Sequence, residues 1–268
     1  MNLDDRIAVI TGAGSGIGRA LAVRFAQRGA RHVVCTDLNE DDAEATAQMI
    51  GAGASSAALD VAEEKAIEDL VEQTEDEIGN IDIFVSNAGY GQGGGLELPT
   101  GDWERMMRVH TWSHLAAARA VIPYMVARGG GYLLNTASAA GLLTQMDSGP
   151  YAVSKHAALA FSEWVAINYG DQGIGVSVLC PQAVRTNISA NAIKNDNAEE
   201  GLDMIGQASA DGVLEPEVVA DACIEAMAEG RFLVLPHPQV ATYFQRKAND
   251  YDRWLNGMRR FKAKLLNS

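Results

Sequence analysis

The chain has 268 residues, of which 47% are hydrophobic, and its mean hydropathy is −0.05. This length and composition suit one α/β domain with a large core rather than two small domains. Its 21 basic and 35 acidic residues give a net charge of −14, which would repel a nucleic-acid backbone and anionic lipid alike, so we expect neither as a partner.

The N-terminal segment and the cysteines favour a cytoplasmic protein. Segment 4–6 is charged, unlike a secretory signal, and no apolar run approaches the roughly 20 residues that span a bilayer, so we expect no membrane insertion. The three cysteines are far apart and set among apolar neighbours: Cys35, Cys180 and Cys223. We therefore expect buried, reduced thiols and no metal site.

A strand, a glycine-rich turn and a helix open the chain. RIAVIT, from Arg6 to Thr11, is a β-branched apolar run, GAGSGIG follows at once, and the apolar spacing of RALAVRFAQRG is helical. Gly12, Gly16 and Gly18 would permit a tight turn, a close approach to a ligand and close packing of the helix on the strand, while the helix N-terminus offers N–H groups to an anion. The alternative is an ordinary glycine-rich connection, but the flanking strand and helix favour a nucleotide site.

An acid ends the second expected strand, HVVCTD, which runs from His32 to Asp37. Asp37 lies about 20 residues beyond the last glycine, where a carboxylate binds the ribose hydroxyls of a dinucleotide. It would repel the extra phosphate of NADP, and neither Ser15 nor Leu38 offers a cation for that phosphate, so NAD is favoured over NADP. Asp37 could instead cap a helix that begins near Asn39.

Helices and strands then alternate, which predicts a parallel, doubly wound sheet. We expect helices over residues 40–50 and 63–78, a strand that ends at Asp60, and a strand over residues 81–86. Small residues follow in NAG, residues 87–89, and leave room for a nucleoside. Ligands of such sheets bind at the carboxyl ends of strands, where Asp60 and this segment both lie.

The next expected helix is long, from Gly101 to Ala127, and Pro123 should end or kink it. A strand from Gly131 to Thr136 then brings Ser138 to the edge of the sheet that carries the glycine turn. Taken alone, such a serine is usually a turn residue or a helix cap.

Tyr151 and Lys155 lie four residues apart on a helix that begins near Gly149, so their side chains share one face. A nearby ammonium favours the ionised phenol and would lower the pKa of the tyrosine, which would allow acid–base chemistry. Such a pair also occurs on many solvated helices, and the rest of the site must support the catalytic interpretation.

Four segments, taken together, resemble the short-chain dehydrogenase/reductase family in its single-domain type. TGAGSGIG, NAG, the serine of NTAS, and YAVSK occur in the order and spacing of that family. The resemblance implies an α/β, Rossmann-type, doubly wound, seven-stranded parallel sheet with helices on both faces. It also implies NAD(P)-dependent alcohol oxidation or carbonyl reduction, and a homotetramer or homodimer.

The resemblance also implies roles for single residues. Tyr151 would be the general acid–base, Ser138 would hold the substrate oxygen, and Lys155 would lower the pKa of the tyrosine and bind the nicotinamide ribose. The expected cofactor-binding residues are Gly12, Ser15, Gly16, Ile17, Gly18, Asp37, Leu38, Asp60, Val61, Asn87, Ala88, Gly89, Tyr151, Lys155, Pro181, Val184 and Thr186. Small residues on the catalytic helix would suit a subunit interface: Ala157, Ala158 and Ala160.

Two positions depart from the family pattern. His110 stands where the family usually has a fourth catalytic residue, an asparagine, whose backbone carbonyl holds a water linked to the lysine. A histidine keeps that carbonyl, so we include His110 among the catalytic residues, although it could equally be a satisfied core histidine. Gln182 stands where the family usually has glycine, and it could crowd the nicotinamide or point an amide into the substrate pocket.

Residues 187–212 are polar and acidic, and the length of the segment favours a lid over the substrate within a catalytic domain of residues 1–236. Its few apolar side chains are Ile188, Ile193, Leu202, Met204 and Ile205; with Leu142, Leu143, Met146 and Tyr90 they suggest an apolar substrate. The expected substrate contacts are Tyr90, Gln145, Met146 and Gln182.

The tail, residues 237–268, is aromatic and basic, with seven basic residues against two aspartates. Its net charge of +5 leaves −19 for the remainder, so we expect it to pack on its own or a neighbouring subunit rather than on a membrane. The leading functional hypothesis is hydride transfer between NAD and a secondary alcohol or ketone, with an apolar cyclic or aromatic compound as the expected substrate. The alternative is an NAD-binding sensor or regulatory protein without turnover.

Overall fold

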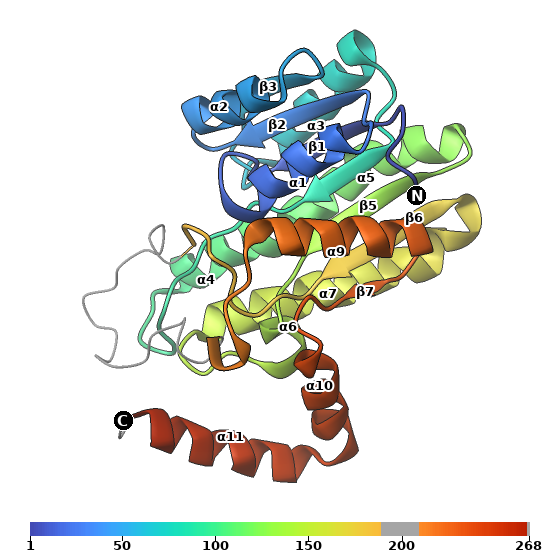
Figure 1. The fold of residues 1–268 in the computed structure, drawn as a ribbon. Helices are drawn as coiled ribbons and strands as arrows, with labels where there is room; N and C mark the ends of the chain where they lie inside the picture. The colour runs from blue at the N-terminus through green and yellow to red at the C-terminus, as the bar shows by residue number, and fades with distance from the viewer. Residues whose placement is uncertain (189–208, 267–268) are drawn as a thin grey trace.

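The structure is a computed structural model that describes residues 1–188 and 209–266. Its centre is a parallel sheet of seven strands in the order β3-β2-β1-β4-β5-β6-β7, which confirms the parallel, seven-stranded sheet that the family resemblance implied (Figure 1). The strands are β1 Ile7–Thr11, β2 His32–Asp37, β3 Ala54–Ala58, β4 Ile83–Ser86, β5 Gly131–Thr136, β6 Ile174–Leu179 and β7 Leu233–Val234. The strand order reverses between β1 and β4, which is where sheets of this kind leave a crevice for a ligand.

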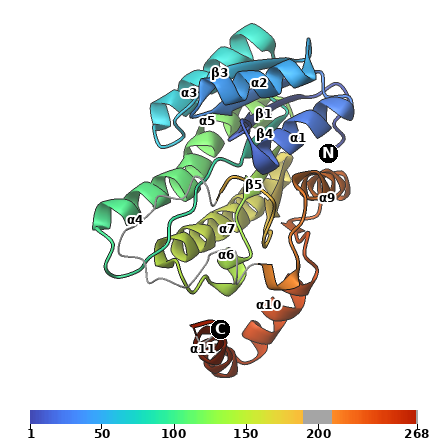
Figure 2. The same ribbon diagram turned by 60° about the vertical axis from the view of Figure 1, so that its left-hand side comes forward.

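Both faces of the sheet are covered by helices, and the central strands are buried throughout. Two apolar clusters show this arrangement, one around Ile10 and Phe25 and the other around Phe84 and Val121. The first joins the sheet to α1 Gly16–Gln27, α2 Glu40–Ile50 and α9 Pro216–Glu229. The second joins it to α3 Glu64–Gln73, α5 Ser113–Ala127 and α7 Gly149–Tyr169, as Figures 1 and 2 also show. Burial on both faces explains why the central strands are largely apolar, whereas the edge strand β3 is partly exposed and contains two serines.

The expected long helix over residues 101–127 is divided. It consists of α4 Thr100–Met107, a π-helical turn over Arg108–Trp112, and α5. Pro123, which we expected to end or kink the helix, does not end it, because α5 continues to Ala127. Pro123 is exposed, so water can bind the carbonyl that the missing N–H leaves free.

Two further helices follow β7 and lie beyond the carboxyl ends of the strands (Figures 1 and 2). Helix α10 Gln239–Asn249 packs against the short helix α6 Ala140–Leu143, and α11 Tyr251–Leu266 extends away from the layers. The three cysteines are buried and free, as the sequence predicted. In the described residues no helix is long and apolar enough to cross a membrane, and no cluster of His, Cys, Asp and Glu could hold a metal ion.

Candidate active site

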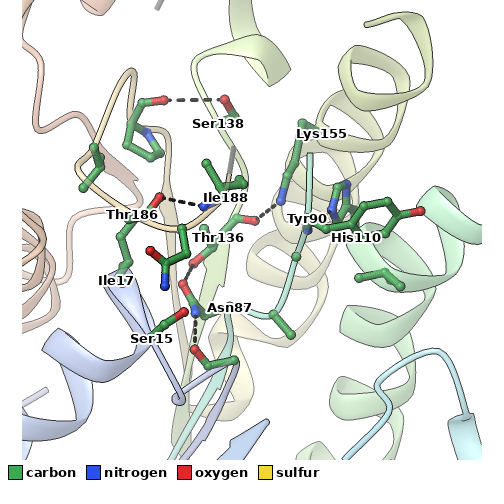
Figure 3. A pocket seen from close by; sticks show the side chains of 18 of the residues that line it. Ser15, Ile17, Asn87, Tyr90, His110, Thr136, Ser138, Lys155, Thr186 and Ile188 are labelled. Carbon is green, nitrogen blue, oxygen red and sulfur yellow. Dashed lines mark hydrogen bonds between the residues drawn. The ribbon is translucent and has the colours of Figure 1, made fainter. Parts of the chain in front are cut away.

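A large cavity lies at the carboxyl ends of the central strands. Its volume of about 1190 Å³ exceeds that of a typical small-molecule site, so it has room for a dinucleotide and a second ligand. It extends from the glycine turn and Asp37 to Ser138 and Tyr151, and its central part is shown in Figure 3. Of the expected cofactor-binding residues, all but Gly18 line it.

The glycines of the first turn are required for different structural reasons. Gly12 and Gly16 have φ angles of +66° and +50°, which favour glycine. A Cβ at Gly18 would lie 2.0 Å from the carbonyl oxygen of Gly12, so Gly18 permits the contact between helix and turn and does not line the cavity. Helix α1 begins without a side-chain cap, which leaves its first N–H groups free to bind an anion. The turn therefore fits a pyrophosphate.

The carboxylate of Asp37 binds the backbone of the glycine turn. Its Oδ2 accepts a hydrogen bond of 2.9 Å from the Gly14 N–H, and its Oδ1 accepts one of 3.2 Å from the Asn39 N–H. The cap of α2 is Asn39, whose side chain accepts from the Asp41 N–H, so the alternative role of Asp37 as the cap is wrong. Arg19, which our reading of the sequence overlooked, also lines the cavity, and its Nε donates to Thr46 over 3.0 Å.

Asn87 joins the ends of three central strands. Its side-chain amide donates to the Thr11 carbonyl over 3.1 Å. Its Oδ1 accepts from the hydroxyl of Thr136, which lies beside it in Figure 3, over 3.1 Å. Its own N–H donates to the Thr11 hydroxyl over 2.9 Å. These bonds fix the floor of the cavity between β1, β4 and β5.

The catalytic helix α7 begins at Gly149 because Ser148 caps it. The Ser148 hydroxyl accepts from the Tyr151 N–H over 3.3 Å, and Pro150 occupies the first turn, where its missing N–H costs nothing. Lys155 is only 3% exposed, and its Nζ donates to the Thr136 carbonyl over 3.0 Å (Figure 3). Burial lowers the pKa of Lys155 to about 8, so this side chain is mostly protonated at neutral pH.

Tyr151 differs from the expectation about its acidity. Burial raises the pKa of the phenol above its ordinary value, and the hydrogen bond with Ser138 acts in the opposite direction. The Lys155 ammonium lies over the ring, 5.7 Å from its centroid, and its hydrogen bond goes to Thr136. In the protein alone the phenol is therefore protonated at neutral pH. Ser138 is buried close by and accepts from the Ala140 N–H over 3.1 Å.

His110 lies in the π-helical turn between Tyr90 and Tyr151 and is fully buried. Its Nε2 accepts from the Tyr90 N–H over 3.1 Å, so the proton is on Nδ1, which donates to the Ser154 hydroxyl over 3.0 Å. Ser154 in turn donates to the Tyr151 carbonyl over 3.0 Å. Burial and the nearby Lys155 hold the pKa of His110 well below its usual value. The ring is thus neutral, and both of its nitrogens are hydrogen-bonded within the protein, as in a satisfied core histidine.

Most of the residues expected to contact substrate line the cavity. Tyr90, Gln145 and Gln182 line the cavity, as do Leu143 and Ile188, whereas Met146 does not. Leu142 belongs to an apolar cluster behind the cavity wall. The expected lid residues Ile193, Leu202, Met204 and Ile205 lie outside the described residues.

Sequence reasoning missed the residues that act through their neighbours. Thr136 receives Lys155 through its backbone carbonyl, a group that every residue carries, so the sequence gives no signal for this role. Ser154 is the fourth residue of YAVSK, and its position on the buried face of the helix was the only available sign of its role.

Fold and site together define a class of protein. A doubly wound parallel sheet with a dinucleotide-sized cavity at its switch point, and a buried serine, tyrosine and lysine at one end of it, is an oxidoreductase of the Rossmann type.

Comparison with known proteins agrees. Residues 6–197 match the short chain dehydrogenase family, and the chain belongs to this family. It is 35% identical over 241 residues to a 1-deoxy-11-beta-hydroxypentalenate dehydrogenase of Streptomyces exfoliatus. The aligned region covers 87% of this chain and 83% of that protein.

Solved structures are similar over nearly the whole chain. A short chain dehydrogenase/reductase from Burkholderia phymatum in complex with NAD has a TM-score of 0.84 and 29% identity, and covers 94% of this chain and 96% of its own. A 7 alpha-hydroxysteroid dehydrogenase complexed with NADH and 7-oxo glycochenodeoxycholic acid has a TM-score of 0.76 and 28% identity, with 87% and 94% covered.

Proposed function

We propose that the protein is an NAD-dependent dehydrogenase or reductase that interconverts a secondary alcohol and a ketone. The observation that carries the proposal is the convergence of Ser138, Tyr151 and Lys155 on one end of the large cavity. When bound, the nicotinamide supplies the hydride chemistry. The chain supplies a phenol that gives its proton to a ketone oxygen or takes one from an alcohol, and a serine hydroxyl that stabilises charge on that oxygen.

The choice of NAD rests on Asp37. Its carboxylate lines the cavity beyond the glycine turn and would repel a phosphate on the ribose. The guanidinium of Arg19 lines the same region, but it already donates to Thr46 and to the carbonyl of Gly14. Fluorescence titration with NADH and NADPH tests the choice, and tighter binding of NADPH would overturn it.

An apolar cyclic or aromatic alcohol is the proposed substrate class. Leu143 and Ile188 add apolar surface to the cavity, and the aromatic ring of Tyr90 lies beside that of His110 at a centroid distance of 5.4 Å. Two similar proteins carry names that refer to polycyclic compounds, the pentalenate and hydroxysteroid dehydrogenases. A panel of secondary alcohols, assayed by NADH formation, tests this class. A preference for small charged alcohols would contradict it.

Tyr151→Phe separates the proposed enzyme from an NAD-binding protein without turnover. The variant keeps the ring that packs against His110 and loses the acid–base group. We expect at least a thousandfold loss of turnover, while NADH binding stays within about twofold. If wild type binds NADH and converts no alcohol or ketone of a broad panel, the sensor hypothesis replaces the enzyme.

We further propose a cytoplasmic homodimer or homotetramer. Ala158 is fully buried against its own subunit and cannot form an interface, so this part of the expectation is wrong. The same helix exposes Trp164 by 53% and Ile167 by 80%. Trp112, in the π-helical turn that packs against this helix, is 52% exposed. Side chains of this kind mark a contact surface. A native mass equal to one chain would refute the proposal.

A further inference from the structure

The chain segment that follows β6 forms one wall of the cavity next to Ser138. The Pro181 carbonyl accepts from the Ala139 N–H over 2.9 Å, and the Ser138 hydroxyl lies 3.5 Å from the same oxygen. Pro181, Gln182 and Ala183 all line the cavity. A shift of this segment would therefore move both the wall and the partner of the catalytic serine.

Gln182 is held from outside the cavity by residues far away in the sequence. Its backbone N–H donates to Nδ1 of His237 over 3.2 Å, and its side-chain amide donates to Oδ2 of Asp211 over 2.9 Å. The other carboxylate oxygen of Asp211 accepts from the Tyr243 hydroxyl over 3.0 Å. Hydrogen bonds to a carboxylate are stronger than bonds between neutral groups. Asp211 thus connects the cavity wall to helix α10.

Helix α10 is itself firmly seated on the body of the protein. Val240 is fully buried and packs in one cluster with Cys180, which directly precedes the wall segment. Lys247 is 7% exposed, and its Nζ donates to the carbonyl of Leu142 over 2.7 Å. Leu142 lies in α6, whose residue Leu143 also lines the cavity. Helix α10 therefore contacts the elements behind two walls of the cavity.

We infer that helix α10 is a positioning element of the active site, and that Tyr243 and Asp211 act through Gln182 to fix the cavity wall beside Ser138. The inference rests on the proposed function, because the wall matters for catalysis only if a nicotinamide and a substrate meet there. It also gives a physical reason for the glutamine at this position, since a glycine would have no side chain to reach Asp211.

The contrasting possibility is that these bonds only fasten the C-terminal helices to the body. Loss of the Tyr243 hydroxyl would then lower stability and leave the relative affinities of different ligands unchanged. The positioning role instead predicts an effect on ligands that reach the end of the cavity near Ser138, and none on ligands that occupy only the end near Asp37.

The test compares NADH with ADP-ribose, which has the same adenosine and diphosphate and lacks the nicotinamide. The variants are Tyr243→Phe and Asp211→Asn, and the control is Tyr251→Phe in α11, a residue that is 56% exposed. We expect the first two to weaken NADH binding about tenfold and to leave ADP-ribose binding within about twofold. The control should change neither. The double variant should bind NADH no worse than Asp211→Asn alone, because both substitutions break the same connection.

Equal effects on NADH and ADP-ribose, or none on either, would overturn the inference even if the variants melt at lower temperature. Failure of the wild-type protein to bind NADH and NADPH would overturn the proposed function and this inference together. If the wild-type protein binds NADH but the variants change NADH and ADP-ribose binding equally, only the inference is overturned. The two failures are therefore distinguishable.

Discussion

The buried ammonium of Lys155 makes a thermodynamic prediction that needs no substrate. Burial lowers its pKa from 10.5 to about 8, whereas in the unfolded chain the side chain titrates near its ordinary value. At neutral pH both states hold the proton, and only the folded state has to keep the charge away from water. The buried charge therefore lowers the free energy of unfolding by about 3 kcal/mol at a pH well below 8. This loss disappears as the pH rises from the pKa of Lys155 in the folded protein to its pKa in the unfolded chain.

Lys155→Met removes this titration. Between about pH 7 and about pH 9.5 the wild-type protein should gain about 2 kcal/mol of unfolding free energy relative to the variant. Urea unfolding without cofactor, followed by circular dichroism at several pH values, measures the difference. Other groups that titrate in this range are common to both proteins and cancel in the comparison.

Lys65→Met is the control. Lys65 is exposed, and its hydrogen bond with Asp69 raises its pKa above 10.5, so its contribution to stability is present below that pH and constant over the measured range. If the difference between wild type and Lys155→Met is also constant, Nζ of Lys155 is hydrated or compensated in solution, and the argument from burial fails.

Three further substitutions test the site. Asp37→Ser should shift the ratio of NADPH to NADH affinity upward at least tenfold in fluorescence titrations, since it removes the charge that repels the ribose phosphate, and an unchanged ratio would refute that role. Gly18→Ala should destabilise the protein by at least 3 kcal/mol, because its Cβ would lie 2.0 Å from a backbone oxygen, whereas Gly170→Ala, with open space around it, should change the unfolding free energy by no more than about 0.5 kcal/mol. His110→Ala should cost about 2–4 kcal/mol in the same urea assay by leaving buried polar partners unsatisfied; a smaller loss would mean that water replaces the ring.

Local chemistry explains what the sequence could predict. The central strands are apolar runs buried on both faces, and the glycine turn lies directly between β1 and α1, so position along the chain determines position at the edge of the sheet. Asp37 and Ser138 follow from the same rule, because each lies at or just beyond the carboxyl end of a strand. Their grouping around one cavity could therefore be predicted without knowing which distant residues they contact.

Contacts between distant residues explain what the sequence could not predict. His110 meets Ser154 across 44 positions, and Gln182 meets Asp211 and His237 across 29 and 55 positions. A histidine or glutamine in place of the usual family residue shows that the site differs at that position. The structural role of the new side chain depends on the distant residue that it contacts. The π-helical turn that aims His110 at its partners also leaves no clear mark in the apolar pattern.

The tyrosine and lysine pair shows most clearly where spacing alone stops being informative. Four residues on a helix bring the two side chains to one face, but the Nζ of Lys155 binds Thr136, and burial acts on both groups in the direction of their neutral forms. The pKa of Tyr151 rises while that of Lys155 falls, so the protein alone holds a phenol ready to donate its proton. To act as a base, Tyr151 needs further positive charge in the cavity. Positive charge close to the phenol would favour its ionised form, and Tyr151 could then accept the proton of an alcohol.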